Sequence, residues 1–169
     1  MELAYRTSHI VRFREVISDF RWIDAKLFDI SGPASHREIL AALIADPWYD
    51  DDYASPSGAL PEPSRGLHGP YSLGGITVSS FQKISPRACR GAVRTWAHAL
   101  GPLPAEFTRR YEEFLDALLV DATAVFRLSD LDDSARHQWD AHLGVLGFHE
   151  FVIVSRTSKT VALVVASDD

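Results

Sequence analysis

The stretch that most constrains the fold lies near the C-terminal end of the sequence. Two runs rich in β-branched and aromatic residues, 148–155 and 160–166, are separated by four polar residues, 156–159. Two strand-forming runs with a short polar connection are typical of a β-hairpin. The second run is apolar at alternate positions on both faces: Val161, Leu163 and Val165 on one, Ala162 and Val164 on the other. We therefore expect this strand inside a sheet that is covered on both sides.

Residues 8–30 carry apolar side chains at intervals of three or four, which predicts an amphipathic helix. The stretch 20–30 is also rich in aromatic and β-branched residues, so a strand is the alternative there. Gly32-Pro33 should end this element, and Ser35 with Glu38 forms the capping-box pattern of a short helix. The apolar stripe of the predicted long helix consists of Ile10, Phe13, Ile17, Phe20, Ile23, Leu27 and Ile30.

The middle of the chain alternates strand and helix signals. Residues 76–81 predict a half-exposed strand, and Ser85-Pro86 is a helix start because serine caps and proline fits the first helical position. A second helix should follow Gly101-Pro102 and pair with the first as an antiparallel helical hairpin. Residues 122–128 predict a strand, and 130–142 a short polar helix or an irregular crossover. The expected fold is α+β: a mostly antiparallel sheet of about four strands, with the C-terminal β-hairpin, packed against about four helices.

Residues 47–70 show neither strand nor helix periodicity and are rich in proline, glycine and aspartate. Loops of this length are uncommon in compact domains and are often lids or binding loops. The 46 residues before it are too few for an independent core, so we do not place a domain boundary here. Residues 1–169 are therefore expected to form a single globular domain.

The charge balance argues against nucleic-acid binding. The chain has 17 lysines and arginines against 23 aspartates and glutamates, a net charge of −6, whereas phosphate binding needs basic surface. No apolar stretch approaches the roughly 18 residues of a membrane helix, and the N-terminal residues lack a secretory pattern. The single cysteine cannot form an internal disulfide. We expect a cytoplasmic protein that binds neither membrane nor nucleic acid.

Residues 130–150 contain the densest set of groups that could carry chemistry. Histidine and carboxylate side chains together can relay protons or bind a divalent metal. The candidates for catalysis are His137, Asp140, His142 and His149. His137 and His142 are five positions apart and would not project together from a helix, and His149 and Glu150 should face opposite sides of a strand. Such residues are more often solvated side chains of loops and helix ends.

The long loop offers a different kind of site. Aromatic side chains that could anchor a contact alternate there with negative charge, which would suit a protein partner with a basic surface. The alternative is a solvated loop whose aromatic residues fold back onto the domain. The candidate binding residues are Trp48, Tyr49, Asp50, Asp51, Asp52 and Tyr53.

Other motifs carry less weight. Cys89 would lie in the first turn of a helix between arginines, which favours a reactive thiolate, but a lone cysteine among small apolar residues is more often part of the core. Ser80 and Lys83 match the Ser-x-x-Lys pattern by chance, because that serine must begin a helix. Nucleotide-binding glycine motifs and Glu-x-x-His pairs do not occur, so we expect no cofactor and assign no metal ligands.

Two functions remain from the sequence. The first is a non-catalytic binding or accessory module that engages a protein partner, with the acidic aromatic loop as its contact. The alternative is a small enzyme that uses the His/Asp cluster on a small-molecule substrate, by acid–base or metal-assisted chemistry. Self-association through a strand edge leaves a homodimer open.

Overall fold

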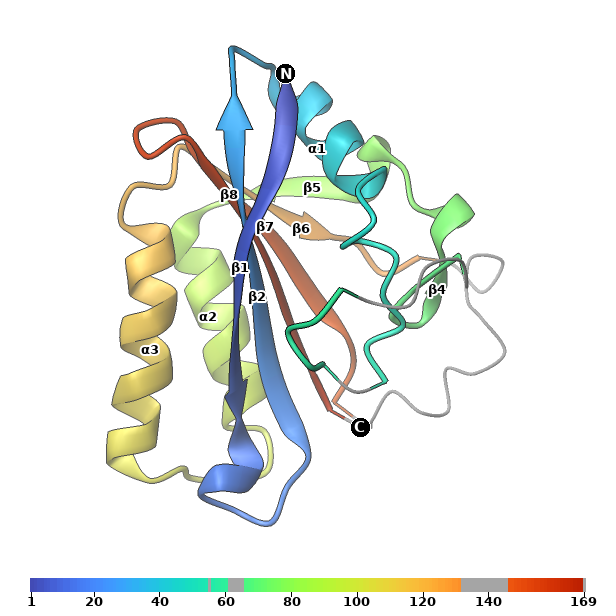
Figure 1. The fold of residues 1–169 in the computed structure, drawn as a ribbon. Helices are drawn as coiled ribbons and strands as arrows, with labels where there is room; N and C mark the ends of the chain where they lie inside the picture. The colour runs from blue at the N-terminus through green and yellow to red at the C-terminus, as the bar shows by residue number, and fades with distance from the viewer. Residues whose placement is uncertain (55, 61–65, 132–145, 169) are drawn as a thin grey trace.

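A computed structural model describes residues 1–54, 56–60, 66–131 and 146–168. This part of the chain is mixed α+β, with a main antiparallel sheet of six strands and three α-helices (Figure 1). Across the sheet the order is β1 (Glu2–Arg12), β2 (Arg21–Ser31), β8 (Thr160–Asp168), β7 (His149–Ser155), β6 (Ala124–Leu128) and β5 (Phe81–Ile84). The helices are α1 (His36–Ile44), α2 (Pro86–Ala97) and α3 (Ala105–Leu119). A small second sheet pairs β3 (Leu67–His68) with β4 (Tyr71–Ser72).

The prediction of a C-terminal hairpin is confirmed. β7 and β8 pair antiparallel from His149 opposite Ala166 to Ser155 opposite Thr160. They are the two central strands of the sheet, and every residue of β8 between its two ends is buried. The expectation that this strand is covered on both sides is therefore also confirmed.

The prediction of a helix over residues 8–30 is wrong. These residues form most of the hairpin of β1 and β2, joined by a short 3-10 turn at Phe13–Glu15. The strand alternative for residues 20–30 is what the structure shows. The apolar spacing was misleading because β2 is buried on both faces and so lacks the alternation of a half-exposed strand.

The middle of the chain follows the prediction except that one strand begins later than expected. Ser85 caps α2 by accepting a hydrogen bond from the amide of Ala88, and the Ser35–Glu38 capping box opens α1. The predicted strand at 76–81 begins later, because Thr77 and Ser80 cap a 3-10 turn at Val78–Ser80 and the strand starts only at Phe81. The described residues thus have more strands than the expected four and one helix fewer.

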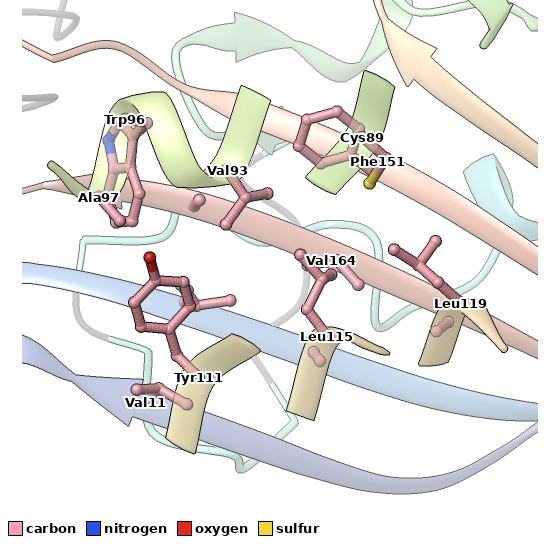
Figure 2. Close-up of a cluster of buried hydrophobic side chains, with 14 of the residues drawn as sticks. Val11, Cys89, Val93, Trp96, Ala97, Tyr111, Leu115, Leu119, Phe151 and Val164 are labelled. Atoms are coloured by element: carbon pink, nitrogen blue, oxygen red, sulfur yellow. The ribbon is translucent and has the colours of Figure 1, made fainter. Parts of the chain in front are cut away.

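One face of the main sheet, here called the helix face, is covered by α2 and α3, which lie antiparallel and side by side (Figure 1). Its core is almost entirely apolar (Figure 2). Helix side chains such as Val93, Leu115 and Leu119 meet strand side chains such as Phe151 and Val164. Burial of this kind stabilises a fold by about 25 cal/mol per Å² of apolar surface.

The opposite face, the loop face, is covered by α1 and by the segment that follows it. Residues 46–54 and 66–72, here called the anchored loop, contain little regular structure apart from β3 and β4. They pack against apolar side chains of β2, β7 and β8 such as Phe28, Val152 and Leu163. Ionisable side chains are buried among these apolar groups, and they form the candidate site described next.

Candidate functional site

The predicted histidine cluster is only partly visible. His137, Asp140 and His142 lie outside the described residues, so their convergence stays a prediction. His149 is the first residue of β7 and faces the helix face, whereas its neighbour Glu150 is buried on the loop face. The two side chains do face opposite sides of the strand, as their positions predict.

His149 is held as a neutral imidazole. Its Nε2 donates to the backbone oxygen of Leu146 at 2.9 Å, and its Nδ1 lies 3.4 Å from Nη2 of Arg127. Burial lowers the pKa of His149, and the nearby guanidinium acts in the same direction. A neutral imidazole with its Nε2 proton engaged in this way presents only its Nδ1 lone pair for further contacts.

The acidic aromatic residues of the long loop fold back onto the sheet. Tyr49 and Tyr53 are completely or almost completely buried. Trp48 is partly buried, and its ring stacks on that of Tyr5 with centroids 3.5 Å apart. As the loop is folded here, Tyr49 and Tyr53 belong to the core and cannot contact a partner. The three aspartates, Asp50, Asp51 and Asp52, are partly exposed.

Lys26 of β2 holds one end of the loop. Its Nζ lies 2.6 Å from Oδ2 of Asp51, 3.0 Å from the backbone oxygen of Trp48 and 3.2 Å from the hydroxyl of Tyr53. The ammonium also lies 4.4 Å from the centre of the Tyr53 ring. An ammonium has three donors, so these three acceptors satisfy it although the side chain is only 2% exposed.

His68 and Glu150 hold the other end. Nδ1 of His68 lies 2.5 Å from the backbone oxygen of Tyr49, and Nε2 lies 2.5 Å from Oε2 of Glu150. The Tyr49 hydroxyl donates to Oε1 of Glu150 at 2.9 Å, and its ring stacks on the imidazole. A carbonyl oxygen only accepts, so Nδ1 carries a proton. The second ring nitrogen, Nε2, is hydrogen-bonded to Oε2 of Glu150, so both ring nitrogens have a partner.

Asp24 is the least satisfied member of the group. It lies two positions before Lys26, and its Oδ2 is 3.8 Å from Nζ, whereas its buried Oδ1 has no hydrogen-bond partner among the described residues. Burial raises the pKa of Asp24 to about 6, against a smaller opposing effect of Lys26. Asp24 and Glu150 both pair with Val165, so they lie two strands apart on the same face, roughly 10 Å between backbones.

These side chains, here called the polar cluster, connect the anchored loop to the central strands. The cluster consists of Asp24, Lys26, Tyr49, Asp51, Tyr53, His68 and Glu150. Burial and the neighbouring carboxylates raise the pKa values of Tyr49 and Tyr53, so both phenols stay protonated and act as hydrogen-bonding groups. Because His68 and Glu150 are inaccessible to solvent, we interpret the cluster as a clamp for the loop.

The structure also places the groups that could bind a metal ion or act as a nucleophile. Within the described ranges no set of three histidine, cysteine, aspartate or glutamate side chains is arranged to hold a metal ion. Cys89 is buried, and desolvation raises the pKa of its thiol to about 12, which makes it a core residue. No helix in the same ranges is long and apolar enough to cross a membrane.

Sequence reasoning missed three members of the polar cluster: Asp24, Lys26 and His68. Asp24 and Lys26 alternate with apolar residues in β2, but such alternation ordinarily indicates the solvent-facing side of a strand, so it gives no sign that they are buried. His68 carries no signal either, because it lies in a segment without periodicity. Its role depends on Glu150, which is 82 positions away in the sequence.

Comparison with known proteins gives no indication of what the site does. No protein-family model matches the chain, and no curated protein matches it. Among solved structures, the chain is similar to one described as the crystal structure of citrus MAF1, with 16% identity and a TM-score of 0.38. The match covers 90% of this chain and 92% of the other. A similarity at this level carries no argument about function.

Proposed function

We propose that this protein is a non-catalytic binding module that engages a protein partner with a basic surface through the anchored loop. The observation that carries the proposal is the polar cluster, which fixes an irregular loop by buried ionic and hydrogen-bonded contacts. Loops held by a rigid scaffold are common sites of recognition.

The free-energy cost of burying ionisable groups suggests that the polar cluster serves to fix the conformation of the loop. Burying ionisable groups costs more than burying apolar groups of similar size, so an apolar contact would hold the loop at least as firmly. Buried polar groups can instead specify one conformation, as we infer for this loop. A loop that is already ordered loses less conformational entropy when a partner binds.

The outer side of the anchored loop carries acidic and aromatic side chains that suit a partner with a basic surface. Trp48, Asp50 and Asp52 remain partly accessible while the tyrosines are buried. Asp50 accepts a hydrogen bond from the amide of Leu67, and Asp52 accepts one from the amide of Ala54, so the carboxylates have fixed directions. Together with the net charge of −6, they favour a partner with a basic surface.

The test is affinity capture from an extract of the native source with a charge-neutral loop variant. Asp50→Asn with Asp52→Asn removes two charges but keeps the side-chain oxygens that accept the loop hydrogen bonds. The control, Glu113→Gln with Asp116→Asn, removes two exposed charges from α3. We expect a protein that is retained by the wild type and the control, is lost from the loop variant, and is released by salt. Equal retention by the loop variant, or no retained protein, would reject the proposal.

The enzyme hypothesis stays a prediction, since three of its four residues lie outside the described ranges. The homodimer, likewise, stays a prediction. Size-exclusion chromatography with light scattering, at several protein concentrations, measures the oligomeric state directly.

A further inference from the structure

A hollow of about 380 Å³ lies on the helix face, between α2 and strands β6 and β7. Small residues of α2 and of the turn after it, Gly91, Thr95 and Ala99, form one wall. Arg127, Leu146 and His149 form other parts of the wall. The volume falls within the range of roughly 300–1,000 Å³ that small-ligand sites occupy.

Arg127 gives this hollow its charge. The side chain rises from β6 on the helix face and is partly buried, with its Cζ 5.9 Å from the centre of the Phe151 ring. Among the described residues no carboxylate forms an ion pair with it, in contrast to Arg21, which lies 2.5 Å from Asp19. A partly desolvated guanidinium without an anion is electrostatically unsatisfied, and an anionic ligand would satisfy it.

His149 positions this guanidinium. Its Nε2 proton is engaged by Leu146, so its Nδ1 lone pair accepts from Arg127 and adds no charge of its own. Asp130 and Asp168 act on His149 electrostatically, but neither is an ion-pair partner of Arg127. Within the described ranges the remaining donors of Arg127 have no partner and are available to the hollow.

We propose that this hollow binds a small organic acid, with its carboxylate on Arg127 and its apolar body against α2. A planar guanidinium matches a carboxylate through two parallel hydrogen bonds. One arginine balances one negative charge, and the small side chains of α2 leave room for a hydrocarbon or aromatic body. This site lies on the other side of the sheet from the anchored loop, and it does not depend on the proposed protein partner.

The probe for the test is benzoate, which is titrated into the full chain. Its binding is measured by ¹⁵N–¹H NMR. We expect concentration-dependent shifts of the amides of Gly91, Thr95 and Ala99 at roughly millimolar benzoate, a normal affinity range for a ligand with so few atoms. Benzamide, which has the same shape without the charge, should bind about tenfold or more weakly, as expected for loss of a charged hydrogen bond. Inorganic phosphate should not reproduce the shifts. Equal shifts with phosphate would show a general anion site and overturn the proposal.

Two variants locate the binding. Arg127→Gln should weaken benzoate binding by about tenfold or more, whereas Arg94→Gln, the same change at an exposed position of α2, should alter it by less than about twofold. Gly91→Phe adds a ring to the wall of the hollow at a position where a Cβ has no heavy atom within 4 Å, and it should abolish binding even if Arg127→Gln fails to fold. Unchanged binding in Gly91→Phe, or no shifts in the wild type, would refute the site.

Discussion

The helix face and the loop face of the sheet are closed by different means. On the helix face, two regular helices satisfy their own backbone groups and contribute apolar side chains to the core. On the loop face, the anchored loop has few internal backbone pairs, and polar side chains of β2 and β7 reach up to hold it. Directed polar contacts also occur on the helix face, where the buried Arg21 donates to the backbone oxygens of Trp96 and Ala97 at the end of α2, but they are more numerous on the loop face.

An irregular segment can be part of a core when directed polar contacts supplement its apolar packing. Apolar packing is non-directional, so by itself it would leave several arrangements of the loop with similar free energies. Lys26 contacts a backbone oxygen, a carboxylate and a phenol at once, so these contacts favour the loop conformation that brings the three together. The cost is that the loop face should respond to charge and pH more strongly than the helix face.

The largest effect is expected for Lys26→Met. Removing the ammonium leaves Asp24 and Asp51 buried or half-buried without their cation, and breaking a buried pair in this way costs about 3–5 kcal/mol. Urea unfolding near neutral pH measures the loss. The control Arg6→Met removes a cation from an exposed ion pair with Asp29 and should leave the unfolding midpoint nearly unchanged. A loss for Lys26→Met no larger than that of the control would contradict the clamp.

Leu115→Ala tests the helix face. This side chain is 2% exposed in the apolar core, and truncation should lower the free energy of unfolding by about 2–4 kcal/mol through lost burial and the cavity left behind. Because no ionisable group is involved, the loss should be the same at about pH 5 and about pH 8. A strong pH dependence of this loss would mean that the two faces are not independent.

A pair of glycines tests how closely the anchored loop fits the sheet. Gly69 has φ +51°, and a Cβ there would overlap the ring of Phe148, so Gly69→Ala should cost about 2–3 kcal/mol from strain and overpacking. Gly66 has φ +62° with open space around it, so Gly66→Ala should cost about 1 kcal/mol from strain alone. Thermal unfolding of both variants compares them directly. Equal losses would show that the loop does not press on Phe148.

The smallest change in the free energy of unfolding is expected for Asp24→Asn, and it is a gain in stability. The pKa of Asp24 is about 6 in the folded protein against 3.8 as its ordinary value, so the folded state binds this proton more tightly and the carboxylate lowers stability above pH 6. Asp24→Asn should therefore raise the free energy of unfolding by about 1–2 kcal/mol near pH 7.5, and the gain should fade as pH falls toward 4. Urea titrations across this range test it. Destabilisation near pH 7.5 would mean that Asp24 is a net favourable partner of Lys26.

Some of this structure is predictable from the sequence. The β7–β8 hairpin and the starts of α1 and α2 depend on local chemistry: short strand-forming runs, a serine cap and a proline at the first helical position. The β1–β2 hairpin was not found, because β2 is buried on both faces and its apolar spacing resembled a helix. Asp24 and Lys26 lie outside the apolar stripe that was assigned to that helix.

The polar cluster could not be predicted because its contacts are long-range. Tyr49 meets Glu150 across 101 positions, and Lys26 meets Asp51 across 25. Residues 48–53 were identified as special by their composition, but composition does not reveal which side chains point inward. The buried tyrosines and the partly exposed aspartates differ only in their position on the folded loop.

The central place of β8 has a consequence for the chain during its synthesis. The hairpin of β1 and β2 emerges early, yet the inner edge of β2 pairs with residues about 130 positions later, from Asp29 opposite Thr160 onward. Until then β2 is an open edge that another chain could extend, and inward-pointing charges discourage such pairing. We expect Asp24 and Lys26 to protect the nascent chain from aggregation in this interval, before β7 supplies the Glu150 that completes the polar cluster.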